Sequence, residues 1–532
     1  MAIKTHYDAV VVGGGHNGLV SASYLAHAGL RVLLLESGHE LGGATVSQKV
    51  FPGMDARLSR YSYLVSLLSP TIIKELGLRF STRRRKIASC TPYTRDGVAG
   101  ALLLSNVDAD ASYTSFHALT GDADWRGYHR LLELEQALAS MVWPTVLEPL
   151  RSREDWKALL GTPTERDAWE AFVERPVGET IEQLIQHDVL RGMVFTDGKI
   201  GIFTHAHDET LIQNRCFIMH VIGNGTGEWL VPVGGMGTLV DELASSARRG
   251  GAQLVTGASV EAISTGNPHH SIVFNHNGQR MEVSATRVLV SAGPQVFSRL
   301  LGTTLANSPT DEGSVCKVNM LLRRLPRLKA AGIDPRDAFA GTLHIDESYS
   351  QMEASFRQAS SGSLPHVPPA EVYCHTLTDD SILGDDLRKQ DYQTLTLFGL
   401  DVPYRLFETE KEEKKSAMLQ GYLRGLNRLL DEPIEDCIAL DSEGKQCIEI
   451  KCPQDLENDV ALDRGNIFHS TLSWFFADEP AQVGTYGVDT GFDRVYRCGS
   501  SALRGGAVSG IPGRNAAHQI FNELGIDMPA AR

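Results

Sequence analysis

The stretch VVVGGGHNGLVSASYLAHAGLRVLLLE, residues 10–36, decides how the N-terminal part of the chain folds. Residues 8–12 are apolar and mostly β-branched, so they predict a buried strand, and residues 31–35 predict a second one. Between these strands a glycine-rich turn leads into a helical pattern that ends at Gly29, which suits a left-handed helix cap. Strand, turn, helix and strand in this order are typical of a unit that binds a dinucleotide.

The turn itself consists of Gly13, Gly14, Gly15, His16, Asn17 and Gly18. Gly13 permits the tight turn, Gly15 lets the backbone approach a pyrophosphate, and Gly18 allows the helix to pack closely on the sheet. The start of the helix offers free N–H groups and the positive end of its dipole to phosphates. Glu36 ends the second strand, where a carboxylate accepts hydrogen bonds from ribose hydroxyls and repels a 2′-phosphate. The pattern therefore disfavours NADP.

Composition narrows the class of protein. The 532 residues carry a formal net charge of −15, and 42% of them are hydrophobic. These values predict a soluble globular protein and disfavour a nucleic-acid partner, whose phosphates need a positive surface. The eight cysteines form no C-x-x-C pair, so we expect free thiols in a reducing compartment.

Residues 1–532 contain no apolar run near the roughly 20 residues that span a bilayer, and a cytoplasmic location is expected. The basic run Arg83–Lys86 is either a solvated loop or a contact with anionic lipid headgroups.

A second glycine pair, Gly42-Gly43, follows Glu36 closely, whereas a nicotinamide dehydrogenase would usually continue with another helix and strand. This arrangement resembles the flavin-binding start of the superfamily that holds amine oxidases and phytoene desaturases. In that superfamily the glycine pair runs beside the pyrophosphate toward the flavin, so the resemblance implies FAD as the cofactor. The contacts expected at this end of the chain are Gly13, Gly15, His16, Asn17, Gly18, Glu36, Ser37, Gly42, Gly43 and Ala44.

The segment VYRCGSSALRGGAVSGIPGRNAAHQIF, residues 495–521, again predicts a strand, a glycine loop and a helix. It resembles the C-terminal signature of the phytoene desaturase family and its carotene-ketolase relatives. The resemblance implies that backbone N–H groups and a helix N-terminus reach the pyrimidine side of the flavin, where positive potential stabilises the reduced anion. Leu503-Arg504 replaces the His-Pro of many relatives, which leaves the substrate subgroup open. The matching positions are Gly499, Ser500, Gly506, Val508, Ser509 and Gly510.

Two passages in the middle of the chain resemble the same family. One begins at Pro232 and the other, VLVSAG, spans residues 288–293. The resemblance implies that the backbone of Val260 contacts the adenine and that Ala292 lies near the cofactor.

The resemblance implies an α/β fold built from two domains. We expect a Rossmann-like FAD-binding domain assembled from the discontinuous segments 1–75, 226–300 and 456–532. An inserted α+β substrate (cap) domain takes residues 76–225, which are mostly helical in pattern, and residues 301–455.

Two polar residues are candidates for the chemistry. Lys317 lies in GSVCKVNMLL, which resembles the amine-oxidase segment whose lysine holds a water against flavin N5; the alternative is a lysine on a solvent-facing strand edge. His469 is either a positioning or proton-transfer group or a structural histidine. The aromatic residues at 474–476 would then form an apolar substrate wall. No ligand spacing predicts a metal.

The sequence GNGTGEW, residues 223–229, has glycines without a preceding apolar strand, so no NAD(P)H domain is expected and electrons would pass to oxygen or a quinone. The leading hypothesis is an FAD-dependent oxidoreductase that takes a hydride from a C–H bond of a lipophilic, polyene-like or isoprenoid-like substrate. The alternatives are a flavin amine oxidase, a flavin-dependent isomerase and a lipid-binding module that resembles GDP-dissociation inhibitors. A lipophilic substrate would favour transient docking on a membrane, and the sequence leaves the oligomeric state open.

Overall fold

Strand β1 (His6–Val12) lies inside a seven-stranded sheet of the computed structural model, which describes residues 3–305 and 311–529. We call it the first sheet. Its strand order is β10-β11-β12-β1-β2-β9, and β18 pairs with the end of β12. The residues of β1 from Val10 to Val12 are buried, as expected for a strand covered on both faces. The other strands are β2 (Val32–Leu35), β9 (Gln253–Val255), β10 (Ala258–Ser264), β11 (His270–His276), β12 (Gln279–Val290) and β18 (Val495–Arg497).

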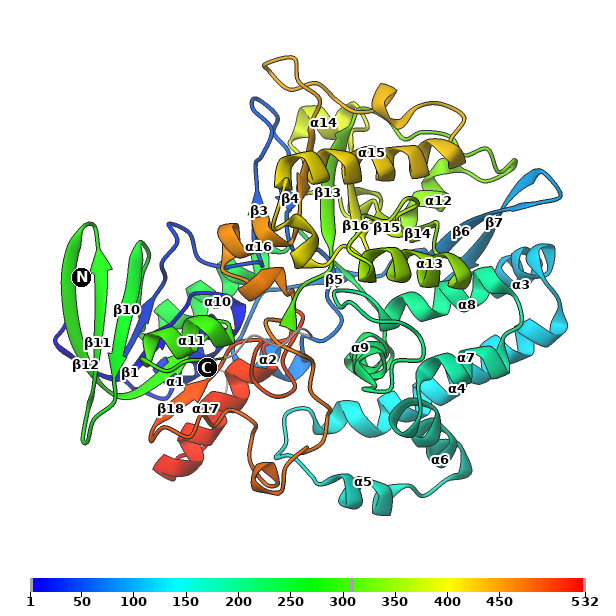
Figure 1. Ribbon diagram of the computed structural model, residues 1–532. Coiled ribbons are helices and arrows are strands. Elements are labelled where there is room, and N and C mark those ends of the chain that lie inside the picture. Colours follow the sequence, from blue (N-terminus) through cyan, green and yellow to red (C-terminus); the bar gives the residue numbers. More distant parts are fainter. Residues whose placement is uncertain (1–2, 306–310, 530–532) are drawn as a thin grey trace.

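The first sheet joins a parallel part to an antiparallel part. Strands β9, β2, β1, β12 and β18 pair in parallel, whereas β10, β11 and β12 form antiparallel pairs. Helix α1 (His16–His27) packs against α10 (Gly237–Gly250) and α17 (Ile511–Leu524), so both ends of the chain meet here (Figure 1). This arrangement confirms the predicted α/β fold with a Rossmann-like part assembled from distant segments.

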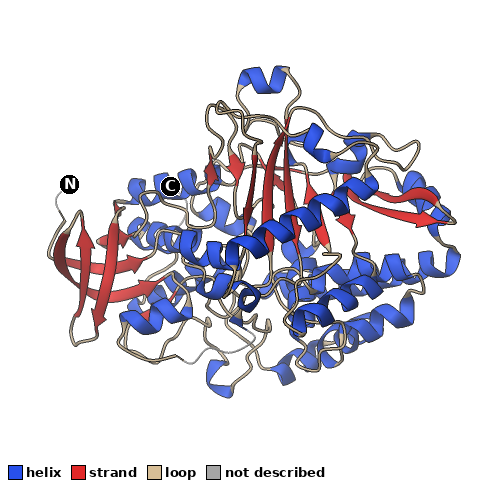
Figure 2. Ribbon diagram, turned by 45° about the horizontal axis from the view of Figure 1, so that its top comes forward, coloured by secondary structure: helices blue, strands red, loops and turns tan. Residues whose placement is uncertain are grey.

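A second sheet of seven strands stands beside the first (Figure 2). Its order is β17-β13-β16-β15-β14-β6-β7, and all its pairs are antiparallel except β14 with β6. Residues 76–225 are mostly helical, as expected, but they also contribute the hairpin of β6 and β7 to this sheet. The strands are β6 (Ile87–Arg95), β7 (Val98–Ser105), β13 (Cys316–Leu322), β14 (Thr342–Ile345), β15 (Ala370–Tyr373), β16 (Gln393–Gly399) and β17 (Ile448–Lys451).

Helices α3 to α9 form a layer below the second sheet in Figure 1. They bury one large apolar cluster, in which Phe172 stacks on Phe217 with ring centres 5.4 Å apart. Their bounds are α3 (Ala109–Leu119), α4 (Asp122–Val142), α5 (Arg153–Leu159), α6 (Pro163–Trp169), α7 (Val177–Leu184), α8 (Asp188–Phe195) and α9 (Ile212–Val221).

The remaining helices and short strands connect these layers. The helices are α2 (Pro70–Glu75), α11 (Pro294–Leu300), α12 (Pro335–Ala340), α13 (Tyr349–Ser360), α14 (Asp385–Lys389), α15 (Lys411–Leu429) and α16 (Pro453–Val460). Two short ladders pair β3 (Ser47–Gln48) with β4 (Leu58–Ser59) and β5 (Thr82–Arg83) with β8 (Val231–Pro232). The domain boundaries given above stay predictions.

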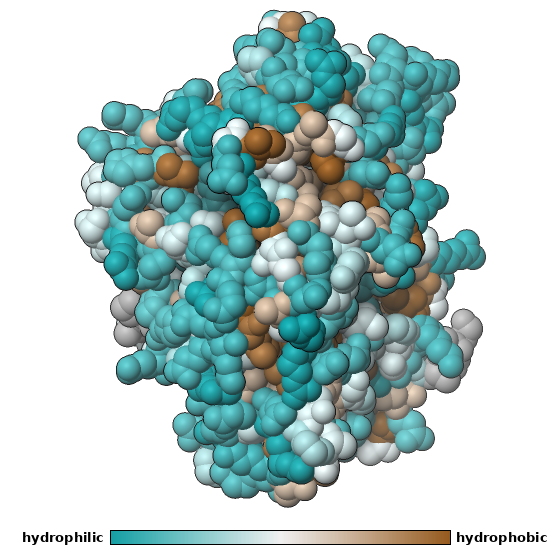
Figure 3. All heavy atoms as spheres, turned by 90° about the vertical axis from the view of Figure 1, so that its right-hand side faces the viewer, coloured by the Kyte–Doolittle hydropathy of each residue, from teal (hydrophilic) through white to brown (hydrophobic). Residues whose placement is uncertain are grey.

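The surface is mainly polar on the face that lies to the right in Figure 1. Hydrophilic side chains cover most of that face, and apolar ones lie in small groups (Figure 3). Across residues 3–305 and 311–529 no helix is long and apolar enough to cross a membrane. In the basic run, Arg83 pairs with Asp379, Arg84 with Glu228 and Lys86 with Asp337. These ion pairs within the protein favour a structural role for the run over a contact with lipid headgroups.

A buried ion pair ties the helical layer to the second sheet. Lys199 follows α8, and its Nζ lies 2.8 Å from Oδ1 of Asp401, just beyond β16. Both side chains are almost fully buried, and Lys199 also donates a hydrogen bond to the carbonyl of Thr204. Burial of two charges is tolerated here because each neutralises the other.

We expect Lys199→Met to reduce the free energy of unfolding by about 3–5 kcal/mol, because Asp401 would be left buried without its partner. Thermal and urea unfolding of the purified protein would measure the loss. The matched control is Lys199→Met combined with Asp401→Asn, which removes both charges and should recover much of the stability. Equal losses in the single and double variants would contradict this explanation.

Candidate active site

The glycines of the first turn separate into two kinds. A side chain at Gly18 would collide with the carbonyl oxygen of Gly13, and a Cβ at Gly13 would lie 2.7 Å from the carbonyl oxygen of Ser291. At Gly15, by contrast, no atom lies within 4 Å of the position a Cβ would take. Gly13 and Gly18 are therefore needed for packing, whereas Gly15 borders open space at the N-terminus of α1.

The second glycine pair lies against this open space. The Gly42 N–H donates a hydrogen bond of 2.9 Å to the carbonyl of Gly14. A Cβ at Gly43 would be 3.6 Å from the Cα of Gly15. The two glycine loops are thus in direct contact and border one open space beside Gly15, into which a pyrophosphate can fit.

Glu36 organises the start of both loops. Its Oε2 accepts a 2.6 Å hydrogen bond from the Gly14 N–H, and its Oε1 accepts one of 2.7 Å from the Gly38 N–H. The Ser37 hydroxyl also donates to Oε1, at 3.3 Å. Oε2 keeps a second lone pair that can receive a ribose hydroxyl. Val260 is on β10, which begins at Ala258 with a hydrogen bond to the carbonyl of Glu36.

The C-terminal motif contacts the N-terminal one directly. Asn17 Nδ2 donates to Ser500 Oγ at 3.2 Å, although the two residues are 483 positions apart. The carbonyl of Ala292 accepts a hydrogen bond from Ser501, and Gly499 packs on the backbone of Ser291. All three predicted cofactor segments therefore meet at the carboxyl ends of β1, β12 and β18.

The rest of the C-terminal motif leads into α17. Gly510 is its N-cap and adopts a φ of 71°, which favours glycine. Ser509 Oγ accepts a hydrogen bond from the N–H of Ile511, and Gly506 packs among apolar side chains from the cavity region. Val508 reaches the cavity described next.

A cavity of about 620 Å³ extends from these loops to the second sheet. His16, Thr45 and Ser500 line the end near the glycine loops. The opposite wall is a face of the second sheet, where strand register places one side chain from each of four neighbouring strands in a row. These side chains, which we call the wall row, are Lys317, Phe398, Glu371 and His344.

Lys317 is a buried member of the wall row, because β13 lies between β17 and β16 and not at the solvent edge. Its Nζ donates a 3.0 Å hydrogen bond to the carbonyl of Ser59 and lies 4.3 Å from the centre of the Tyr63 ring. Burial lowers the pKa of Lys317 well below its ordinary value, because an ammonium group is poorly solvated there.

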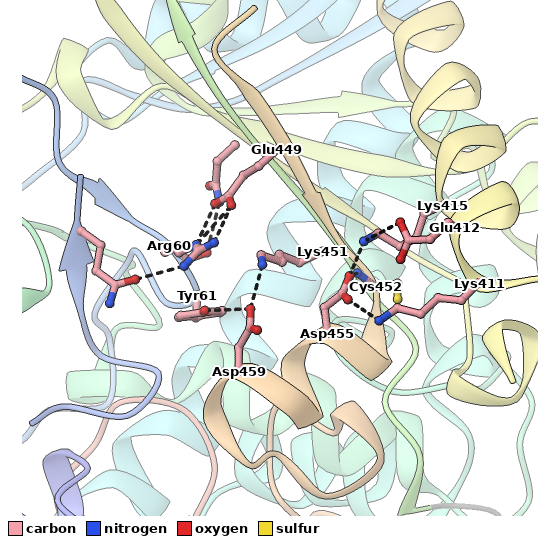
Figure 4. A network of polar contacts seen from close by, with 12 residues as sticks. Arg60, Tyr61, Lys411, Glu412, Lys415, Glu449, Lys451, Cys452, Asp455 and Asp459 are labelled. Atoms are coloured by element: carbon pink, nitrogen blue, oxygen red, sulfur yellow. Dashed lines mark hydrogen bonds and ion pairs between the residues drawn. The ribbon is translucent and has the colours of Figure 1, made fainter. Parts of the chain in front are cut away.

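A network of charged groups holds the backbone that Lys317 contacts (Figure 4). Arg60, next to Ser59, forms a forked pair with Glu449 of β17. Tyr61 and Lys451 both bond to Asp459 of α16. A second part of the network binds α16 to α15 through Asp455, Lys411 and Lys415. These bonds fix the segment that supplies Tyr61 and Tyr63 to the cavity.

His469 and His16 both line the cavity. Burial lowers the pKa of His469 to about 4, and burial together with the nearby His469 lowers the pKa of His16 to about 3. His16 Nδ1 lies 3.0 Å from Thr45 Oγ1, while His16 Nε2 is buried without a partner among the described residues. Both rings are therefore neutral near pH 7.

The aromatic residues after His469 do not form the expected substrate wall. Phe475 packs on Trp156, and Phe476 lies beside Trp169 inside the helical core. Phe468 lines the cavity instead. The expectation was wrong because the chain turns away from the cavity after His469, which has a φ of 67°.

Sequence reasoning missed a group of acids in the same cavity. Glu135, Asp197 and Glu371 line it, and burial raises their pKa values to about 8, about 8 and about 7. Glu347 lies behind Glu371, and His344 Nδ1 is 2.5 Å from its Oε2. Facing atoms of His344, Glu347 and Glu371 lie within 4.8 Å of one another, but hydrogen bonds within the protein already engage them.

Comparison with known proteins identifies the family. The model of the flavin-containing amine oxidoreductases matches residues 18–436. An uncharacterized protein of Mycobacterium tuberculosis is 43% identical over 526 residues and 97% of each chain. Pyridine nucleotide-disulfide oxidoreductase domain-containing protein 2 of Mus musculus is 30% identical over 98% of this chain and 94% of that one. The chain belongs to the flavin-containing amine oxidoreductases.

Two further similarities extend the comparison. A limonene dehydrogenase subunit from Castellaniella defragrans is 23% identical over 98% of this chain and 95% of its own. A putrescine oxidase structure superimposes with a TM-score of 0.58 and 18% identity, and it covers 97% of this chain and 99% of that one. The structural likeness supports the shared fold of an FAD-binding domain with a substrate domain.

FAD is the cofactor of this family, and the residues of the chain fit it. Gly15 and Gly43 border space that a side chain would fill, and Oε2 of Glu36 keeps a free lone pair at the end of β2. Two buried polar atoms lack partners among the described residues, Asn17 Oδ1 and His16 Nε2, and lie beside the glycine loops. These are the features that a dinucleotide with donor and acceptor groups would satisfy.

We expect Gly15→Ala to impair FAD binding and Gly18→Ala to impair stability. Gly15→Ala should leave the thermal stability of the FAD-free protein unchanged and weaken FAD binding at least tenfold, because its methyl group enters the open space. Gly18→Ala should lower the stability of the FAD-free protein by about 1–3 kcal/mol through overpacking. Thermal unfolding without FAD and titration with FAD would separate the two. Normal FAD affinity in Gly15→Ala would contradict the assignment.

Acid should destabilise the protein partly through His469. The folded-state pKa of about 4 lies below the unfolded value of about 6.5, so the unfolded chain binds a proton first as pH falls. The stability present above pH 6.5 is therefore lost between pH 6.5 and 4, by up to about 3 kcal/mol. His469→Asn keeps a side chain that tolerates the positive φ and should flatten this part of the stability profile. An unchanged acid profile would contradict this role.

Proposed function

We propose that the protein is an FAD-dependent oxidoreductase that removes a hydride from a C–H bond of a mainly apolar substrate in the cavity. One observation carries the proposal: one cavity is lined by both glycine-motif regions, through His16 and Ser500, and by the buried Lys317. When bound, FAD supplies the hydride acceptor. Since the chain has no second dinucleotide motif, oxygen or a quinone would receive the electrons.

The side chains around the cavity can hydrogen-bond, exchange protons and exclude water. Lys317, whose pKa is lowered by burial, can hold a water molecule or exchange a proton at its Nζ. His469, which is neutral near pH 7, can accept or donate a hydrogen bond toward the substrate. Apolar residues such as Phe398 and Phe468 exclude water and favour an apolar substrate body.

Dehydrogenation of a CH–CH bond in a lipophilic substrate is the first candidate reaction. It is supported by the likeness of residues 495–521 to the phytoene desaturase signature and by similarity to a protein named as part of a limonene dehydrogenase. Transient docking on a membrane belongs to this proposal, because such a substrate would be delivered from lipid.

Amine oxidation is the second candidate, favoured by Glu135 and Asp197 on the cavity wall. A protonated amine would be attracted to these carboxyl groups and would stabilise their ionised forms. The lipid-binding module without flavin chemistry is disfavoured, since a binder of that kind has no use for the open space at Gly15.

Anaerobic mixing of the yellow holoenzyme with a panel of alkenes, terpenes and alkylamines tests the proposal. A functional substrate should bleach the flavin absorbance and yield the C=C or C=N product by mass spectrometry. In Lys317→Met, the reduced enzyme should reoxidise in air at least tenfold more slowly, with an unchanged oxidised spectrum as the control for folding. A colourless protein that fails to take up added FAD would sink the proposal, and unchanged reoxidation would remove only the role of Lys317.

A further inference from the structure

The wall row contains one carboxyl group that faces the cavity, that of Glu371. Loss of a hydride from carbon leaves an electron-poor centre, and a neighbouring C–H or N–H bond must then give up a proton. Glu371 is 2% exposed, lines the cavity and lies directly across the strands from Phe398 on one side and His344 on the other. Lys317 follows Phe398 in the same row.

We propose that Glu371 is the catalytic base that accepts the proton lost by the substrate. The inference rests on the proposed function, and it holds for either candidate reaction. The hydride leaves with its two electrons to the oxidised flavin. The neighbouring C–H or N–H bond breaks, its electron pair forms the second bond of C=C or C=N, and its proton forms an O–H bond with Glu371.

Hydrogen bonds hold the carboxyl group of Glu371 in place. The Tyr373 hydroxyl donates to Oε2, and the Thr196 hydroxyl lies 3.2 Å from Oε1. Tyr373 in turn stacks near Tyr63, with ring centres 4.9 Å apart, and Tyr63 contacts Lys317. The carboxyl group is thus fixed at the wall near the end of the cavity that Lys317 occupies.

Behind Glu371 the structure offers a path that can remove the proton. Thr196 Oγ1 lies 3.5 Å from Oε1 of Glu347, and Glu347 is bonded to His344. A hydroxyl group between two carboxyl groups can accept a proton from one and donate its own to the other. Glu347 and His344 can share the proton only transiently. Transfer of the hydride to oxygen or a quinone consumes one proton in each turnover, so the proton returns to the cavity for that step and Glu371 is restored.

The charged and titratable groups that face Glu371 set its basicity. Burial is the main cause that raises its pKa, to about 7, and Glu347 raises it further. His344 on β14, with Tyr373 and Thr196, opposes this rise. Asp197 also faces this cluster, and Arg85 approaches from the segment before β6. A base with a pKa near the working pH is the most effective.

The central test is flavin reduction by a bleaching substrate in stopped-flow experiments with wild type and Glu371→Gln. Glutamine keeps the shape and one hydrogen-bond acceptor but cannot take the proton. We expect the wild-type rate constant for reduction to rise with pH through about 7, because the acceptor must be ionised. In Glu371→Gln the flavin should be reduced at least about 100-fold more slowly. The rate constant of this variant should no longer rise with pH, and the substrate affinity should stay near normal.

Two further variants separate chemistry from folding. Glu371→Ala should regain reduction activity on addition of formate, which can serve as a free base in the vacated space. Glu432→Gln, which alters a carboxyl group that is paired with Arg324 and lies outside the cavity lining, should keep the wild-type pH dependence. If Glu371 had only a structural role, formate would not rescue Glu371→Ala, and Glu371→Gln would keep the pH dependence of flavin reduction.

Infrared spectroscopy of the oxidised holoenzyme gives a readout that needs no substrate. The protonated-carboxyl region should contain a component that titrates near pH 7 in wild type and is lost in Glu371→Gln, while the components of Glu135 and Asp197, which titrate near pH 8, remain. The inference is overturned if Glu371→Gln reduces at the wild-type rate with the same pH dependence, or if the component near pH 7 is unaffected. It is also overturned if the purified protein holds one divalent metal ion that this variant loses. If no compound bleaches the wild type, the proposed function fails, while the infrared titration still decides whether Glu371 holds a proton near neutrality.

Discussion

Close backbone packing around Ser291 is the constraint on which the rest of the structure depends. The backbone of Ser291 packs against Gly13 and Gly499, and the carbonyl oxygen of Gly13 packs against Gly18. A Cβ at any of these glycines would collide with backbone atoms. The end of β12 thereby meets the ends of β1 and β18 and the start of α1. Because the three segments come from opposite parts of the chain, this contact turns separate sequence motifs into one cofactor site.

The cavity beyond this contact contains many titratable groups whose charged forms are disfavoured by burial. Burial acts on bases and acids in opposite directions, since it lowers the pKa of Lys317 and His469 and raises that of Glu371. For each of these three groups the uncharged form is therefore more favourable than it would be in water. An apolar molecule can therefore bind in such a cavity without burying a charged group of the wall. Each of these groups can still exchange a proton when the reaction releases a proton.

The sequence predicts those parts of the site that depend on local backbone geometry. The turn at residues 13–18 and the cap at Gly510 are visible because only glycine suits their conformations or contacts. The depth of Lys317 and the pairing of Glu371 with His344 were not predictable in the same way. They depend on strand register between segments 27 or more residues apart. No local pattern in β14 or β15 indicates which of their side chains lie on the same face of the sheet. The β6–β7 hairpin was missed because helical segments dominate the sequence that follows it.

The position of β18 and α17 has a consequence for biosynthesis. The ribosome delivers the first glycine turn early, but Ser500, which Asn17 contacts, comes hundreds of residues later. Until residues 495–521 have emerged, the nascent chain cannot close the nucleotide pocket, and the edge of β12 that β18 will occupy stays open. Cofactor capture is therefore a late event, and a truncated product should be left with an unpaired strand edge that chaperones or proteases can recognise.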